Sequence, residues 1–423
     1  MAKPGSVNSL MLRRITSEEF LVHPLQARAI TDALRLIFRE NRYADKVIEQ
    51  ALRENRKAGA RDRAFIAESV YEIVRRYRLY AYALGREPQS EYDFWQLLGV
   101  HLLASRPDRP LPDWRELRGF FPEKIKPRLA HANLPRAVRE SVPDWLDQLG
   151  QSELGERWDD TLRALNQPAR VVLRANRLKT DRKTLGALLL RDHGIETEPV
   201  GEGEALALTR RANVFATEAF KSGLFEVQDY SSQLVATLLD PHPGMRVVDA
   251  CAGAGGKTLH ISALMDNKGV VVAMDPLAWK LDELRKRARR AGAFNIETRT
   301  LDLAKTIKRL YGSADRLLLD VPCSGLGVLR RNPDAKWKLQ PPDIESLRVT
   351  QAEILAQYAP ILKRGGLMVY ATCSVLPSEN NRQIAQFLEL PQGAGYELLE
   401  ERAILPQDEG FDGFYMAKLE RKT

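Results

Sequence analysis

The sequence predicts an α/β protein whose C-terminal part folds around a mostly parallel sheet, preceded by a small α+β module and an all-helical N-terminal region. Three observations lead to this prediction: helical periodicity in the first part of the chain, mixed strand and helix patterns from near Pro168, and regular alternation of strands and helices from Gly244 onward. The chain has 423 residues, more than one domain usually contains. We therefore expect three parts, residues 1–150, 151–235 and 236–423.

The composition is that of a globular protein with a modest excess of positive charge. Apolar residues make up 44% of the chain, but no run reaches the ~18 residues that span a bilayer, and the first residues lack the apolar core of a signal peptide. The net charge of +8 favours a polyanionic partner, although many basic proteins bind no nucleic acid. The three cysteines are too few and too far apart for a disulfide framework, and no Cys/His cluster suggests zinc. We expect a cytoplasmic protein with reduced thiols, no metal and no membrane segment.

Between about Leu25 and Gly150 the apolar residues recur at the spacing of helices. Two series show this: Ile30, Leu34, Ile37 and Phe38, and then Phe65, Ile66, Val70, Ile73, Val74 and Tyr77. Arginines surround the second series, at Arg61, Arg63, Arg75, Arg76 and Arg78. They form either a solvated helix surface or a face that contacts phosphates. The proline-rich stretch from Ser105 to Trp114 should interrupt the helical pattern.

Mixed patterns after Pro168 predict a small α+β module. Residues 170–178 and 205–210 are strand-like, and residues 181–194 form a helical pattern that stops at Gly194. The stretch 224–239, "LFEVQDYSSQLVATLL", should pass from a strand into a helix.

From Gly244 onward, strands and helices alternate. The strand candidates are residues 245–250, 269–275, 296–302, 315–322 and 367–373, and helical patterns lie between them, for example at 277–291 and 351–363. Such alternation predicts a parallel sheet wrapped by helices, which binds ligands at the carboxyl ends of its strands. The polar residues at those ends are Asp249, Asp275, Asp302, Asp320, Cys323 and Cys373.

A glycine-rich turn, "VVDACAGAGGKT", follows the first of these strands. Its loop residues are Cys251, Ala252, Gly253, Ala254, Gly255, Gly256 and Lys257. A phosphate-binding P-loop would need glycine where Cys251 stands, and the dinucleotide fingerprint lacks its third glycine at the required offset. The remaining class is a nucleoside ligand without a phosphate to bind, such as S-adenosyl-L-methionine, which needs close approach to the backbone.

Acidic strand ends could complete such a nucleoside site. Asp275 lies some twenty residues beyond the glycines, where its carboxylate could accept both ribose hydroxyls, and Asp302 could then lie beside the adenine. A helix cap or turn is the commoner role for a single aspartate after a strand. Four aspartates at four successive strand ends favour the ligand site.

Two of the three cysteines, Cys323 and Cys373, end apolar strands fifty residues apart. A lone cysteine in this position is usually a small buried apolar residue. Two at one ligand-binding edge suggest chemistry, and the reaction that needs a thiol beside a methyl donor is methylation of a pyrimidine at carbon-5. A thiolate that adds to carbon-6 activates carbon-5, and a cation or base must activate the thiol. Lys257, Arg330 and Arg331 are candidate cations, and spacing alone leaves open which cysteine attacks.

Several motifs together resemble the RsmB/Sun (Nop2-related) family of S-adenosylmethionine-dependent RNA cytosine carbon-5 methyltransferases. They are "DACAGAGGKT", "DVPCSGLGVLRRNPDAKW" and "YATCSVLPSENN", with "FEVQDYSSQLVA" upstream and "FDGFYMAKLERK" at the end, so the resemblance covers about residues 165 to 423. It implies a Rossmann-like class I methyltransferase domain. The order of the PCSG and TCS motifs is the most specific part of the match.

The same resemblance implies roles for individual residues. Cys373 would be the nucleophile, and Cys323 would help to resolve the covalent adduct. The 251–257 loop, Asp275, Asp302 and Asp320 would contact the cofactor, with Asp320 close to both the methionine part and the target base. One departure is Ala254, where the family usually has proline, so the turn should be looser, while the glycines and Lys257 remain in place.

The match in the N-terminal part of the chain rests on fewer residues than the match in the C-terminal part. "RDRAFIAESVYEIVRRYR" resembles the NusB-like helical domain of bacterial members, and "RANRLKT" resembles the start of their RNA-binding linker module. We therefore expect a monomeric enzyme acting on RNA, with ribosomal RNA favoured and tRNA as the alternative. A non-catalytic RNA-binding assembly factor and a Rossmann dehydrogenase are the rival functions.

Overall fold

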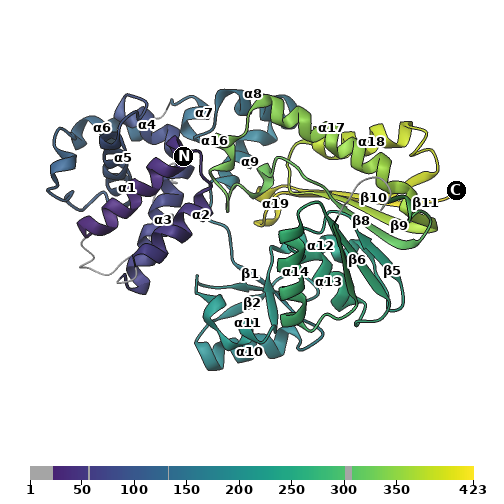
Figure 1. The fold of residues 1–423 in the computed structure, drawn as a ribbon. Coiled ribbons are helices and arrows are strands. Elements are labelled where there is room, and N and C mark those ends of the chain that lie inside the picture. Colours follow the sequence, from purple (N-terminus) through teal and green to yellow (C-terminus); the bar gives the residue numbers. More distant parts are fainter. Residues whose placement is uncertain (1–21, 56–57, 132, 301–306) are drawn as a thin grey trace, which may run out of the picture. The chain divides into compact units, whose positions relative to one another are not determined.

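The computed structural model describes residues 22–55, 58–131, 133–300 and 307–423. The chain forms two compact units (Figure 1). The helical unit contains Met1–Asp147 and the short segment Asn332–Lys338, and the sheet unit contains Gln148–Arg331 and Leu339–Thr423. Within the described residues, no helix is long and apolar enough to cross a membrane.

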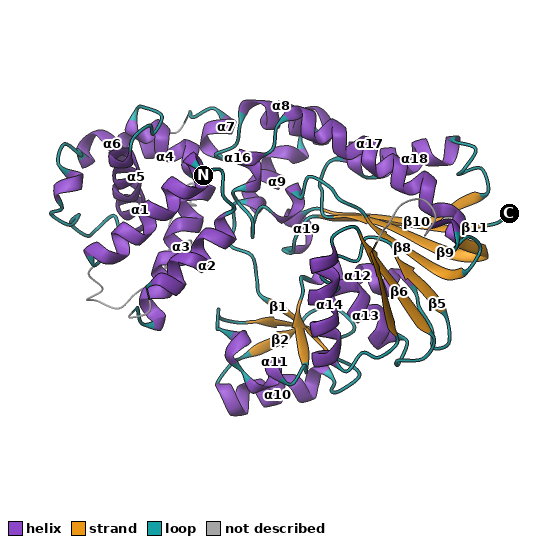
Figure 2. Cartoon of the chain, viewed as in Figure 1, coloured by secondary structure: helices purple, strands orange, loops and turns teal. Residues whose placement is uncertain are grey.

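Helices build the first unit, as the periodicity predicts (Figure 2). They are α1 (Pro24–Arg39), α2 (Ala44–Glu54), α3 (Ala60–Arg75), α4 (Tyr77–Leu84), α5 (Glu91–Ser105), α6 (Pro122–Leu129) and α7 (Arg136–Arg139). The two predicted apolar series face the common core, where Ile30, Leu34, Phe65 and Ile66 are buried. Helix α5 ends at Ser105, where the proline-rich stretch begins, because proline cannot continue a helix.

At least four of the arginines around the second apolar series make contacts inside the helical unit, and one of them, Arg63, donates to the carbonyl of Leu52 in α2 at 2.6 Å. Arg75 and Arg76 both pair with Glu72, and Arg78 pairs with Asp144 at 2.8 Å. Arg63 therefore links α3 to α2 and Arg78 links α4 to Asp144, whereas Arg75 and Arg76, at the end of α3, pair with Glu72 of the same helix.

A segment from far along the chain completes the helical unit. It carries helix α16 (Ala335–Lys338) and begins a few residues after the PCSG motif, which ends at Gly325. Lys336 is only 1% exposed and donates to the carbonyl of Arg75 at 2.8 Å, and the indole of Trp337 donates to the carbonyl of Val74 at 2.7 Å. Burial lowers the pKa of Lys336. The carboxylate of Asp334 accepts from the first amide of α2.

The predicted α+β module is a four-stranded antiparallel sheet in the order β2-β3-β1-β4. Its elements are β1 (Val172–Ala175), α10 (Arg182–His193), β2 (Thr197–Pro199), β3 (Ala205–Leu208), α11 (Glu218–Lys221) and β4 (Phe225–Val227). Helix α10 ends at Gly194, which has a φ of 62°, as the glycine predicts. Strand β2 was not predicted, because its three residues are largely exposed and carry no apolar pattern.

The large sheet has seven strands in the order β10-β11-β9-β8-β5-β6-β7. The strands are β5 (Arg246–Asp249), β6 (Val270–Asp275), β7 (Ile296–Thr300), β8 (Ala314–Asp320), β9 (Leu362–Thr372), β10 (Tyr396–Ile404) and β11 (Phe414–Arg421). Strands β5 to β9 are parallel, and each corresponds to one predicted strand. The antiparallel strands β10 and β11 were not predicted, since β10 is charged and mostly exposed.

Helices cover both faces of this sheet (Figure 1). They are α12 (Tyr230–Leu239), α13 (Gly256–Leu264) and α14 (Ala278–Ala291) on one face, and α17 (Pro341–Tyr358) and α18 (Asn381–Glu389) on the other. Neighbouring residues such as Val247 and Val248 point to opposite cores, so the buried strands read as continuous apolar runs. Helix α17 begins ten residues before the predicted 351–363 pattern and ends before Pro360.

Candidate active site

Parallel pairing brings the predicted functional residues to one edge of the large sheet. Strands β9, β8, β5 and β6 are consecutive neighbours, so Cys373, Asp320, Asp249 and Asp275 follow one another along their carboxyl ends. Asp302 lies outside the described residues. Among the described residues, no group of three or more His, Cys, Asp or Glu side chains could hold a metal ion.

The glycine loop runs from the end of β5 to the start of α13 at Gly256. Gly253 and Gly255 have φ angles of 55° and 86°, the left-handed region that favours glycine. A Cβ on Gly255 would lie 2.0 Å from a methyl carbon of Leu284, whereas one on Gly253 or Gly256 would meet open space. The carbonyl of Ala254 accepts from Arg287 at 2.8 Å, so a side chain from α14 holds the turn that lacks the proline.

Asp275 closes the loop from the neighbouring strand. One carboxylate oxygen accepts from the amide of Gly253 at 3.0 Å and the other from the amide of Leu277 at 2.8 Å. The carboxylate therefore stabilises the turn through these two hydrogen bonds, as a single aspartate after a strand commonly does. Each oxygen keeps a second lone pair, so it can also accept a ligand hydroxyl.

Asp249 lies under the loop and is almost completely buried. One of its oxygens accepts from the hydroxyl of Thr258 at 2.7 Å, and the other has no hydrogen-bond partner among the described residues. Burial raises the pKa of Asp249 to about 7, and the nearby Asp320 carboxylate adds to this. Burial also raises the pKa of the Cys251 thiol.

A cavity of about 390 Å³ opens beside the loop at the ends of β8 and β9. Its lining includes Lys257, Asp320, Cys323 and Cys373. The ammonium of Lys257 lies 2.6 Å from a carboxylate oxygen of Asp320 and 5.0 Å from the centre of the Phe414 ring. A cation and a carboxylate thus stand together beside the two thiols.

The sulfur atoms of Cys323 and Cys373 are hydrogen-bonded at 3.4 Å, and both cysteines are free. The pKa of Cys323 is raised, first by this hydrogen bond with Cys373, then by burial and by the charges of Cys373 and Glu379. The raised pKa favours the protonated thiol at Cys323, and either sulfur can be the donor in the hydrogen bond between them.

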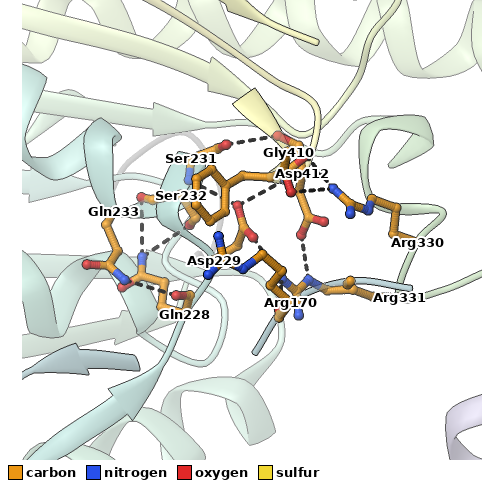
Figure 3. A network of polar contacts seen from close by, with 12 residues as sticks. Arg170, Gln228, Asp229, Ser231, Ser232, Gln233, Arg330, Arg331, Gly410 and Asp412 are labelled. Atoms are coloured by element: carbon orange, nitrogen blue, oxygen red, sulfur yellow. Dashed lines mark hydrogen bonds and ion pairs between the residues drawn. The ribbon is translucent and has the colours of Figure 1, made fainter. Parts of the chain in front are cut away.

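The sequence singled out Arg331 in the remaining cavity wall but not its two aspartate partners (Figure 3). Arg331 pairs with Asp229 at 2.7 Å and with Asp412, and all three line the cavity. Burial, with the nearby Asp229 carboxylate, raises the pKa of Asp412 to about 6. Of the candidate cations, Lys257 and Arg331 line the cavity, whereas Arg330 donates to the carbonyls of residues 410 and 411. The motifs "FEVQDYSS" and "FDGF" carried the signal, since each places one aspartate here.

A mostly parallel sheet with a glycine loop and acidic residues at its strand ends is a Rossmann-like arrangement, and the family that this domain matches makes it a methyltransferase of class I. Residues 236–420 match the family described as 16S rRNA methyltransferase RsmB/F, and residues 142–215 match its ferredoxin-like domain. A probable ribosomal RNA small subunit methyltransferase B from Synechocystis is 32% identical, over 92% of this chain and 97% of its own. The chain belongs to the 16S rRNA methyltransferase RsmB/F family.

Solved structures agree with this fold. The crystal structure of PH0851 has a TM-score of 0.80 at 24% identity and covers 95% of this chain and 100% of its own. NSun6 from Pyrococcus horikoshii, determined with SFG, has a TM-score of 0.61 at 21% identity and covers 67% of this chain and 99% of its own. Family membership makes this protein an S-adenosyl-L-methionine-dependent RNA methyltransferase, which removes the dehydrogenase alternative.

Proposed function

We propose that this protein methylates carbon-5 of a cytosine in the RNA of the small ribosomal subunit, through a covalent adduct with Cys373 that Cys323 helps to release. The observation that carries the proposal is the pair of sulfur atoms 3.4 Å apart in a cavity that Lys257 and Asp320 also line. Relatives named ribosomal RNA small subunit methyltransferase B support the choice of RNA.

A thiol is needed because carbon-5 of cytosine is too weak a nucleophile to accept a methyl group directly. The Cys373 sulfur would bond to carbon-6, which makes carbon-5 an enamine carbon. Once carbon-5 is methylated, a base removes its proton, the sulfur–carbon bond breaks, and the ring double bond and the thiolate are restored. The protonated Cys323 lies where it can donate a hydrogen bond to the departing sulfur.

The loop and the strand ends fit S-adenosyl-L-methionine. Open space beside Gly253 and Gly256 lets a ligand approach the backbone, and the Asp275 carboxylate has lone pairs left for ribose hydroxyls. When bound, the cofactor supplies an electrophilic methyl group. The residues proposed to hold it are Cys251, Ala252, Gly253, Ala254, Gly255, Gly256, Lys257, Asp275, Asp302 and Asp320. Asp320 would stand between the cofactor and the base.

The other parts of the chain are proposed to bind the RNA. The helical region 1–150 and the module within 151–235 would contact the substrate of a monomeric, cytoplasmic enzyme, with 236–423 as the methyltransferase domain. RNA-binding proteins commonly recognise the shape and the unpaired loops of their RNA, so these surfaces would select the target nucleotide.

The direct test uses purified protein, S-adenosyl-L-methionine and unmodified small-subunit ribosomal RNA, with unmodified tRNA in a parallel reaction. Nuclease digestion and mass spectrometry should detect 5-methylcytosine in the ribosomal RNA. Its appearance in tRNA alone would support the tRNA alternative. With no product on either RNA and no covalent adduct on 5-fluorocytosine RNA, the assignment of cytosine carbon-5 and of the covalent mechanism would be wrong.

A further inference from the structure

Glu379 is a completely buried carboxylate with no part in the steps above. It is 0% exposed and stands between the TCS motif and helix α18, at the end of a short 3-10 turn (Pro377–Glu379). Removing a carboxylate from water is costly unless several donors surround it. The donors around Glu379 therefore indicate what the fold uses this charge for.

Four donors surround the carboxylate, and three of them belong to two serines. One oxygen accepts from the amide of Ser324 at 2.8 Å and from the side chain of Gln351 at 3.0 Å. The other oxygen accepts from the hydroxyls of both Ser324 and Ser374. The two serine oxygens are themselves only 3.1 Å apart. A single carboxylate thus joins two turns that lie fifty residues apart in the sequence.

These serines are the residues that directly follow the two cysteines. Ser324 follows Cys323 after β8, and Ser374 follows Cys373 after β9. A second link joins the same turns, since the amide of Gly327 donates to the carbonyl of Cys373 at 2.9 Å. A Cβ on Gly327 would lie 2.8 Å from that carbonyl oxygen and 2.1 Å from the carbonyl oxygen of Gly413. These contacts, which lie close to each cysteine in both turns, help to fix the distance between the two sulfurs.

We propose that Glu379 is a positioning residue, which holds the Cys323 and Cys373 turns together through Ser324 and Ser374 so that Cys323 can act on the Cys373 adduct. This inference rests on the proposed covalent mechanism. It assigns Glu379 to the release of the adduct more than to its formation. Attack needs only Cys373, whereas release needs the two sulfurs close together. The negative charge of Glu379 also helps to raise the pKa of Cys323, which favours the protonated thiol.

Two substitutions separate the geometry from the charge. Glu379→Gln keeps the shape: its oxygen can accept from the Ser324 amide and Gln351, and its NH₂ group can donate to the two serine hydroxyls. Glu379→Ala removes all four contacts. A misplacement of about 1 Å in an active site can cost about a hundredfold in rate. We expect kcat to fall roughly tenfold to a hundredfold in Glu379→Ala with little change in KM for RNA, and a denaturant-resistant protein–RNA adduct to accumulate.

The matched control is Gln383→Ala on α18. Gln383 is another buried polar side chain, and its amide donates to the carbonyl of Ser378 and not to Ser324 or Ser374. It should lower the thermal midpoint without causing adduct to accumulate. Glu379→Gln should recover most of the wild-type rate.

A thiol probe tests the positioning independently of catalysis. Phenylarsine oxide bridges two thiols whose sulfurs lie close together, by forming two As–S bonds and releasing water. Wild-type protein should bind one equivalent across Cys323 and Cys373, and Cys323→Ala or Cys373→Ala should abolish this tight binding. Glu379→Ala should weaken it, and Glu379→Gln should restore it.

The two readouts distinguish failure of the inference from failure of the proposed function. Arsenical binding that depends on Glu379 in a protein without methyltransferase activity would reject the function and keep the positioning. Full release of the adduct and unchanged arsenical binding in folded Glu379→Ala would reject the positioning. If Glu379→Ala does not fold, Ser324→Ala and Ser374→Ala each remove one hydroxyl and test the same link. Unchanged adduct release and arsenical binding in both would equally reject it.

Discussion

The sulfur atoms of Cys323 and Cys373 meet at 3.4 Å because their strands, β8 and β9, are parallel neighbours in the sheet. Asp320 pairs with Ala371 in that register, so each cysteine follows its strand by a short, comparable distance. The two cysteines nevertheless belong to different motifs, PCSG and TCS, and the proposed mechanism gives them different roles.

This asymmetry predicts different phenotypes for the two cysteine variants. Cys373→Ala should abolish methylation and adduct formation, because no other sulfur is proposed to attack carbon-6. Cys323→Ala should still attack but release slowly, which leaves a protein–RNA band that survives denaturing electrophoresis. The opposite pattern, an adduct only in Cys373→Ala, would show that the roles are reversed.

The ion pair between Lys257 and Asp320 should matter for catalysis as well as for stability. Asp320→Asn removes the carboxylate proposed to stand between cofactor and base, so we expect kcat/KM to fall by about a hundredfold. Lys363→Met is a fitting control, because Lys363 pairs at the same 2.6 Å distance with Asp315 at the opposite end of β8. Steady-state methylation assays should show the control within about twofold of wild type. Equal losses of kcat/KM in both variants would mean that the substitutions disturb the folding of the strand and do not act at the site.

Asp249 should make the protein less stable as the pH rises. Its pKa is about 7 in the folded protein and 3.8 as the ordinary value, so between these pH values the folded chain retains a proton that the unfolded chain has lost. The free energy of unfolding attributable to Asp249 should therefore fall from about pH 4 to pH 7, by an amount on the order of a few kcal/mol. Urea denaturation of Asp249→Asn and wild type should show a difference that grows across this range and then levels off.

Asp315→Asn provides a contrast of opposite sign. Lys363 and the amide of Arg246 hold the pKa of Asp315 below its ordinary value despite the opposing effect of burial. Its contribution to stability is therefore present above the ordinary pKa and lost as the pH falls below it. A pH-independent difference for Asp249→Asn would contradict the burial argument.

Trp337 should be important for the helical unit although it lies far away in the sequence. Its indole donates to the carbonyl of Val74 and its rings lie edge-on to Tyr77 at 5.6 Å. Trp337→Ala should cost about 3 kcal/mol or more of the stability of this unit, and Trp337→Phe only about 1 kcal/mol, since the ring packing remains. Limited proteolysis of the helical unit would measure both, and equal resistance of Trp337→Ala and wild type would contradict this packing.

Sequence patterns predicted the parallel core well, because buried parallel strands are continuous apolar runs and their carboxyl ends share one edge. That reasoning brought Asp249, Asp275, Asp320 and both cysteines to one place. Which cysteine attacks came only from the resemblance, since two similar strand ends are equivalent by spacing. Charged strand β10 was missed because an exposed edge strand carries no apolar alternation.

Contacts between distant segments were beyond pattern analysis. Arg331 meets Asp229 across 102 positions, and Glu379 meets Ser324 across 55. Periodicity describes local structure, and nothing local in "PSENN" distinguishes a buried carboxylate from an exposed turn residue. The fold itself had to bring these residues together before their roles could be inferred.

The segment Asn332–Lys338 makes the helical unit discontinuous in the gene. An enzyme shortened by deletion of residues 1–147 would still contain Lys336 and Trp337. It would lack the carbonyls of Arg75 and Val74, which accept their hydrogen bonds. Such a truncation would expose the indole of Trp337 and leave the ammonium of Lys336 without its hydrogen-bond acceptor. A minimal methyltransferase made from this chain would therefore need residues 332–338 to be redesigned as well. The two segments of the helical unit should be treated as one domain.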